Sequence, residues 1–127
     1  MSPQTAARWV AIAAAVETGT GLLLIVRPSL FTWLLFGATL PPAGQALGRL
    51  AAFALFGLAL ACWPRAEQRN GLTKPVIALL SFSLLTALYL IYLAVFRGMS
   101  GLLLWPAVVL HLVLAVLLAR IRIARIH

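Results

Sequence analysis

The sequence predicts an all-α integral membrane protein: a four-helix bundle with a short interfacial helix between its first and second spanning helices. Three observations lead to this prediction. The 127 residues are 64% hydrophobic and only 9% charged, whereas about a quarter of the residues in an ordinary soluble domain are charged. Four apolar runs are each about 20 residues long, enough for a helix to cross a hydrocarbon core of roughly 30 Å. Proline or glycine separates the runs. Residues 1–127 are therefore expected to form a single membrane domain.

Prolines mark the ends of the predicted spans. Proline cannot continue a helix without losing a hydrogen bond, so Pro28 ends the first span and Pro64 the second. Pro75 is acceptable as the first residue of the third span, because the first helical position has no hydrogen bond to lose. The spans are therefore expected at residues 7–26, 44–63, 75–96 and 102–120.

Residues 29–40 are apolar but too few to cross a bilayer. Ser29 can cap a short helix, and Trp33 suits the boundary between lipid and water. The pair Pro41-Pro42 then interrupts the helix. This segment is predicted to be an interfacial or re-entrant piece over the mouth of the bundle, with residues 29–36 as a short helix.

The cations predict how the bundle is oriented. The net charge of +8 would suggest nucleic-acid binding in a soluble protein, but here the positive charges lie near helix ends, so no nucleic acid is expected. The seven on one side of the predicted membrane are Arg8, Arg65, Arg69, Lys74, Arg120, Arg122 and Arg125, and the three on the other are Arg27, Arg49 and Arg97. This imbalance predicts a multi-pass membrane protein with both termini in the cytoplasm.

Glu17 is the most informative residue, because a carboxylate in mid-membrane is costly unless it is protonated, paired or hydrated. Helical rise places Glu17 and His111 each about 13 Å below the outer surface. Similar depths follow for polar residues of the other spans. The sequence therefore predicts an interior polar pocket open toward the outer leaflet, made by Glu17, Arg49, Thr86, Tyr89, Tyr92 and His111 and completed by Phe53, Phe56, Phe82 and Phe96.

A purely structural interpretation of the same residues stays open. In it, Glu17 bonds His111 or Arg49, the tyrosines point at lipid headgroups, and nothing binds. The chain lacks a nucleophile–base pair, a glycine-rich phosphate loop and metal-ligand spacing, and its single Cys62 cannot form an internal disulfide. No catalytic residue, metal ligand or cofactor is assigned, and an enzyme is the less favoured interpretation.

Two stretches carry a resemblance to a known family. The sequences LLLIVRPSLFTWLLFG and LGRLAAFALFGLALACWPR, within residues 17–65, resemble the DoxX-like group of small four-helix bacterial membrane proteins. In that group a proline and an LLFG-type stretch separate the first two helices, and an arginine opens the second. The resemblance implies an inner-membrane protein, some of whose relatives are thought to be subunits or partners of quinone-linked oxidoreductases.

Three functions are therefore expected from the sequence. The first is a non-enzymatic bundle that binds a membrane lipid or a quinone-like molecule, or assists a membrane redox complex. The second is a proton-coupled transporter using Glu17, because AIAAAVETGTGLLL is similar to the first helix of small multidrug resistance transporters, although Arg49 and the basic tail depart from that pattern. The third is a structural or assembly subunit, with self-association as one form of it.

Overall fold

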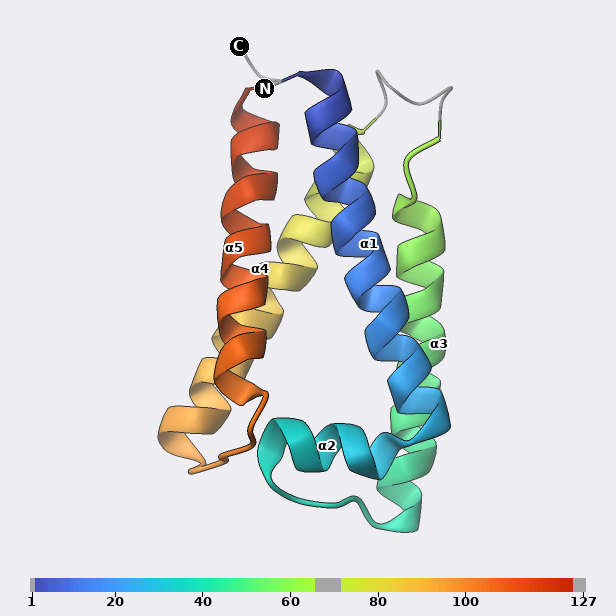
Figure 1. The fold of residues 1–127 in the computed structure, drawn as a ribbon, viewed down its shortest axis with the longest axis vertical. Coiled ribbons are helices and arrows are strands. Elements are labelled where there is room, and N and C mark those ends of the chain that lie inside the picture. The colour runs from blue at the N-terminus through green and yellow to red at the C-terminus, as the bar shows by residue number, and fades with distance from the viewer. Residues whose placement is uncertain (1, 66–71, 125–127) are drawn as a thin grey trace.

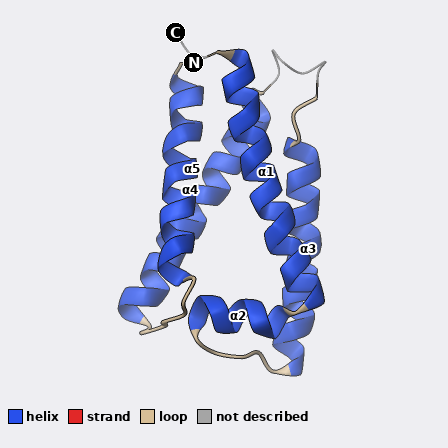
Figure 2. Ribbon diagram, viewed as in Figure 1, coloured by secondary structure: helices blue, strands red, loops and turns tan. Residues whose placement is uncertain are grey.

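The computed structural model describes residues 2–65 and 72–124. They form five helices joined by short connections: α1 (Pro3–Val26), α2 (Pro28–Phe36), α3 (Pro42–Cys62), α4 (Thr73–Phe96) and α5 (Leu104–Ile123). Figure 2 shows helices and loops throughout these residues. All except α2 are long and apolar enough to cross a membrane. The predicted all-α class and the four spanning helices are confirmed. Arg69 and Arg125 lie outside the described residues.

The spanning helices extend somewhat beyond the predicted spans where capping residues favour it. α1 begins at Pro3 rather than at residue 7, because the Ser2 hydroxyl accepts a hydrogen bond from the backbone N–H of Thr5. α5 continues to Ile123 rather than ending at residue 120. Its last turn carries Arg120 and Arg122, and cations are favourable at the negative end of a helix dipole.

α2 runs across one end of the bundle, transverse to the long helices (Figure 1). Only Arg27 separates it from α1. It ends at Phe36, the predicted end of the short helix, because Gly37 adopts a left-handed conformation with φ of 74°. The N–H of Gly37 donates to the carbonyl oxygen of Trp33 at 2.9 Å, which closes the last turn.

The four long helices form two close pairs. α1 packs mainly against α3, and α4 mainly against α5. Gly21 lets α1 approach α3 closely, since a Cβ there would lie 3.2 Å from the carbonyl oxygen of Ala52. The two pairs meet near the chain termini and diverge toward α2, so the fold has the outline of a wedge (Figure 1).

Two apolar clusters close the two ends of the wedge. Near the termini, side chains from α1, α4 and α5 pack with Cys62 at the end of α3; they include Val10, Val76 and Leu118. At the opposite end, Leu35 of α2 packs with Leu90 of α4 and with α5. The backbone N–H of Leu103 donates to the carbonyl oxygen of Leu34 at 2.8 Å and ties α2 to the start of α5. The space between the clusters is where the candidate site lies.

Candidate functional site

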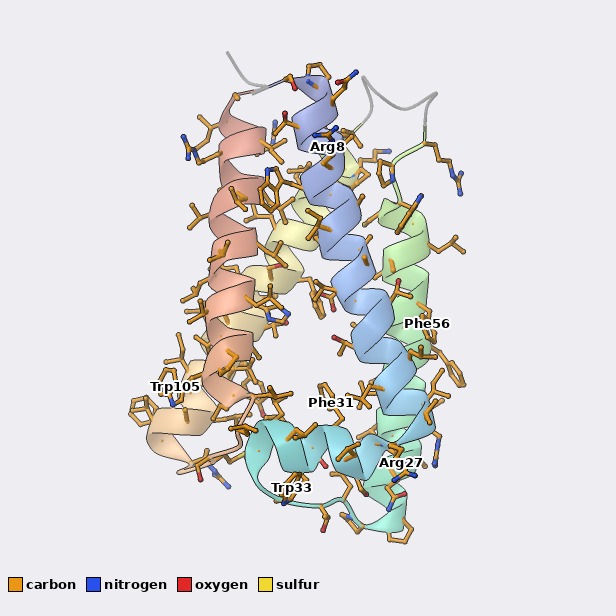
Figure 3. The ribbon with its side chains drawn as sticks, in the orientation of Figure 1. Arg8, Arg27, Phe31, Trp33, Phe56 and Trp105 are labelled. Atoms are coloured by element: carbon orange, nitrogen blue, oxygen red, sulfur yellow. The ribbon has the colours of Figure 1, made fainter. Side chains whose placement is uncertain are left out.

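A cavity of about 780 Å³ lies between the two helix pairs. All five helices contribute to its wall, which is mostly apolar, and its α2 side is formed by Phe31, Leu35 and Phe36. Figure 3 shows Phe31 rising from α2 toward the space between the pairs, whereas Trp33 projects from the other side of the helix. The short helix therefore supplies one wall of the cavity.

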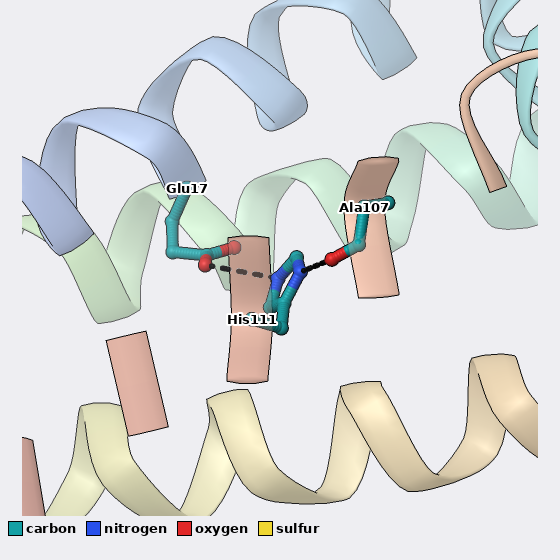
Figure 4. Close-up of polar contacts among 3 residues, drawn as sticks. All are labelled: Glu17, Ala107 and His111. Carbon is teal, nitrogen blue, oxygen red and sulfur yellow. Dashed lines mark hydrogen bonds and ion pairs between the residues drawn. The ribbon is translucent and has the colours of Figure 1, made fainter. Parts of the chain in front are cut away.

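Glu17 and His111 face one another across this space (Figure 4). Glu17 comes from the middle of α1 and is 1% exposed, and His111 comes from α5 and is 8% exposed. The Oε1 atom of Glu17 lies 3.7 Å from Nε2 of His111, within the range of an ion pair. A direct N–H···O hydrogen bond would be 2.7–3.2 Å long, so the pair is slightly too far apart to make one.

The His111 ring is oriented by its own helix. Its Nδ1 atom lies 2.8 Å from the carbonyl oxygen of Ala107, one turn earlier in α5. Because a carbonyl oxygen only accepts, Nδ1 carries the hydrogen and donates. The ring of Phe82 on α4 packs beside the imidazole, with 6.3 Å between ring centroids. These contacts turn Nε2 toward α1 and Glu17.

The Glu17 carboxylate keeps unused hydrogen-bonding capacity. Among residues 2–65 and 72–124, no group donates a hydrogen bond to its Oε1 atom. A buried polar atom without such a partner is destabilising, and most buried polar atoms in proteins have one. Glu17 is a cavity-lining residue, so this unpartnered oxygen belongs to a side chain of the cavity wall.

Thr86 is the third predicted site residue that lines the cavity. Thr20, one turn after Glu17 on α1, lines it as well and was not predicted. Its spacing of three residues from Glu17 is the signal that could have identified it, because residues three apart lie on the same face of a helix. The polar side chains of the wall thus come from α1, α4 and α5.

Arg49 lies elsewhere. It is an exposed residue of α3 and is not part of the cavity wall. Its Nε donates to the carbonyl oxygen of Ile25 at 3.2 Å. The last four carbonyl groups of a helix have no partner within the helix, and Arg49 satisfies one of these at the end of α1. The structure therefore does not bring Arg49 together with Glu17 and His111.

Tyr89 and Tyr92 also lie outside the cavity. They are 61% and 45% exposed, and their rings stack with centroids 6.1 Å apart on the outer surface of α4. The buried face of that helix instead contains Ser83, Ala87 and Leu90. Thr86 lines the cavity beside Leu90, whereas Tyr89 and Tyr92 are not part of its wall.

The aromatic wall also differs from the one predicted. Phe82 lines the cavity, but Phe53 and Phe96 are exposed, and Phe56 lies against Gly21 at the contact between α1 and α3. Phe31 and Phe36 take their place. The interfacial segment was expected to cover the mouth of the bundle, and its aromatic residues were the available signal.

No group of three or more potential metal ligands occurs among the described residues. Comparison of the chain with protein-family models, with curated proteins and with solved structures finds no match. The arrangement itself is an apolar chamber with one buried acid–base pair. Such a chamber suits a molecule that has a long apolar part and a small polar head.

Proposed function

We propose that this chain is a non-enzymatic protein of the bacterial inner membrane that binds an amphipathic molecule, such as a lipid or a quinone-like compound. The observation that carries the proposal is the cavity with Glu17 and His111 in its wall. Its volume of about 780 Å³ lies within the range of ligand sites, roughly 300–1,000 Å³. Such sites are mostly apolar with a few placed polar groups, and this one has that character.

The fold supports a location of this site toward the outer leaflet. The start of α1, the end of α3, the start of α4 and the end of α5 lie at one end, and α2 lies at the other (Figure 1). Arg8 lies at the end with the termini and Arg27 at the end with α2 (Figure 3). The excess of cations belongs to the end with the termini, which favours its placement in the cytoplasm. Helix α2 would then lie near the outer surface. The resemblance to DoxX-like proteins also suggests a role as an accessory subunit of a membrane redox complex.

Binding can be tested by thermal unfolding of the purified protein in detergent with added phospholipids, short-chain quinones and long-chain alcohols. A ligand that binds only the folded state raises its stability in proportion to RT ln(1 + [L]/Kd). Ala54 lines the cavity on α3, whereas Ala46 is exposed on the same helix and does not. The rise in melting temperature is expected to disappear in Ala54→Phe and to persist in the matched control Ala46→Phe.

Two results would contradict binding in this cavity. One is the absence of any stabilising compound in the panel, which would favour the structural subunit. The other is an equal rise in melting temperature for Ala54→Phe and Ala46→Phe, which would place the bound molecule on the outer surface of the bundle.

A proton-coupled transporter is a second candidate, and the position of Arg49 favours it. An arginine inside the bundle would repel a cationic substrate, but Arg49 is not part of the cavity wall. Glu17 and His111 are the titratable groups in that wall. Uptake into proteoliposomes driven by a proton gradient, and lost in Glu17→Gln, would support transport. Binding without gradient-dependent uptake would leave the first proposal as the function.

A further inference from the structure

The Glu17–His111 pair constrains the head group of the bound molecule. Because Nδ1 of His111 donates to Ala107, the proton that distinguishes neutral imidazole from imidazolium is the one on Nε2. Nε2 is also the atom that faces the Glu17 carboxylate. The hydrogen-bonding character of the site therefore depends on how many protons lie between Nε2 and Oε1.

Electrostatics favours one proton for the pair. With no proton, a negative carboxylate would face a neutral imidazole between apolar helices, and with two protons the pair would carry a net positive charge. Isolated charges are costly in such surroundings, whereas a neutral pair is not. With one proton, the pair is either an imidazolium that faces a carboxylate or a neutral imidazole that faces a carboxylic acid. In both cases one partner donates and the other accepts.

The gap of 3.7 Å is short enough for a single oxygen beside the pair to lie within hydrogen-bond distance, about 2.8 Å, of both atoms. A bridging group must accept a hydrogen bond from one partner and donate one to the other. A carbonyl or ether oxygen only accepts, and an ammonium group only donates. A hydroxyl group does both, and it supplies the partner that Oε1 does not find among the described residues.

We propose that the molecule bound in this cavity has a hydroxyl head, as in an alcohol or a phenol, which bridges Glu17 and His111. The inference rests on the proposed binding function and narrows its ligand class. The apolar part of the molecule would extend along Phe31, Phe36 and Leu90, which line the cavity away from the two polar residues. Among redox-active lipids, the reduced form with its hydroxyl groups would bind more tightly than the oxidised form with its carbonyl groups.

The test compares 4-octylphenol, 4-octyltoluene and 4-octylanisole binding to the purified protein in lipid nanodiscs. 4-Octyltoluene has a methyl group of similar size in place of the hydroxyl group of 4-octylphenol. 4-Octylanisole keeps the oxygen atom but has no hydrogen on it to donate. A hydrogen bond to a charged or strongly polar buried pair is expected to favour the phenol by about tenfold or more over each of the others. Affinity ratios from the same nanodiscs are compared between variants, which cancels differences in membrane partitioning.

The preference for the phenol is expected to vanish in Glu17→Leu, and in His111→Leu should the first variant not fold. Thr18→Val, which removes an exposed hydroxyl that donates to the carbonyl oxygen of Ala14, should keep it. Equal affinities of the three compounds for the native protein would overturn the hydroxyl inference and leave the binding function standing. Absence of binding by all three would overturn both. A preference that survives in either leucine variant would overturn the assignment to this pair.

Discussion

Glu17 is tolerated inside the bundle because His111 lies opposite it. Its Oε1 atom is 3.7 Å from the imidazole and is shielded from the surroundings by apolar helices. Removal of one member of a buried polar pair leaves the other without a partner, whereas replacement by a group that still hydrogen-bonds does not. A comparison of Glu17→Leu with Glu17→Gln separates the loss of the polar group from its replacement by another polar group.

We expect Glu17→Leu to lower the free energy of unfolding by about 1–3 kcal/mol, because Nε2 of His111 then loses the carboxylate that faces it at 3.7 Å and meets only apolar side chains there. Glu17→Gln should stay close to the native value, since the amide still hydrogen-bonds. The measurement is unfolding by sodium dodecyl sulfate in mixed micelles. Thr18→Leu, at an exposed position of the same helix, is the control for the larger apolar side chain. Native stability of Glu17→Leu would show that the pair contributes nothing to folding.

At the scale of the elements, α2 is held in place by backbone contacts as well as by side chains. Gly37 ends it in a left-handed conformation. Gly101, in the connection before α5, lies so close that an added Cβ would overlap backbone atoms of Leu34 and Leu35. The same connection donates the hydrogen bond from Leu103 to Leu34. Because α2 forms one wall of the cavity, this contact positions the wall.

Gly101→Ala is therefore expected to push α2 away from α5 and to destabilise the protein by about 1–3 kcal/mol, the usual effect of overpacking. Unfolding in mixed micelles measures the loss, and ligand-dependent stabilisation should fall with it. Gly57→Ala is the control, because a Cβ at Gly57 in α3 meets nothing within 4 Å. Alanine there should be neutral or stabilising by about 0.5–1 kcal/mol. Equal stability of the two variants would mean that α2 does not depend on the close approach at Gly101.

At the scale of the whole molecule, the helices form a wedge of two pairs rather than an evenly packed bundle. α1 with α3, and α4 with α5, make the extensive contacts, and the pairs touch each other mainly near the termini. The diverging ends are bridged by α2 (Figure 1). This arrangement creates a cavity with one end closed by an apolar cluster and the other by a short helix.

The orientation of the wedge predicts the outcome of reporter fusions. Fusions after His127 and within residues 65–74 should both report the cytoplasm, because the excess of lysine and arginine lies on that side. A fusion between α2 and α3, at residues 38–40, should report the periplasm. The enzymatic activity of compartment-specific reporters provides the measurement. A periplasmic signal from either of the first two positions would contradict the proposed topology.

Composition and run length were sufficient to predict the class of fold, the four spanning helices and the short helix between the first two. These features depend on local properties: apolar residues satisfy the lipid, and proline and glycine favour the ends of helices over their interiors. Depth along each helix also follows from the sequence, because the rise per residue is constant. It indicated that Glu17 and His111 lie at one level of the membrane.

The depth of a residue in the membrane does not determine whether its side chain faces the cavity or the lipid. Glu17, Thr86 and His111 share the cavity, whereas Tyr89 and Tyr92 lie on the outer surface of α4 and Arg49 caps α1. In a helix of a soluble protein, a polar stripe marks the face exposed to water. In a membrane helix apolar residues cover both faces, so the hydrophobic pattern no longer indicates which face is buried in the bundle. The rotation of each helix is set by long-range packing, such as Gly21 against Ala52 and Gly101 against Leu34. That packing decided which of the predicted polar residues meet.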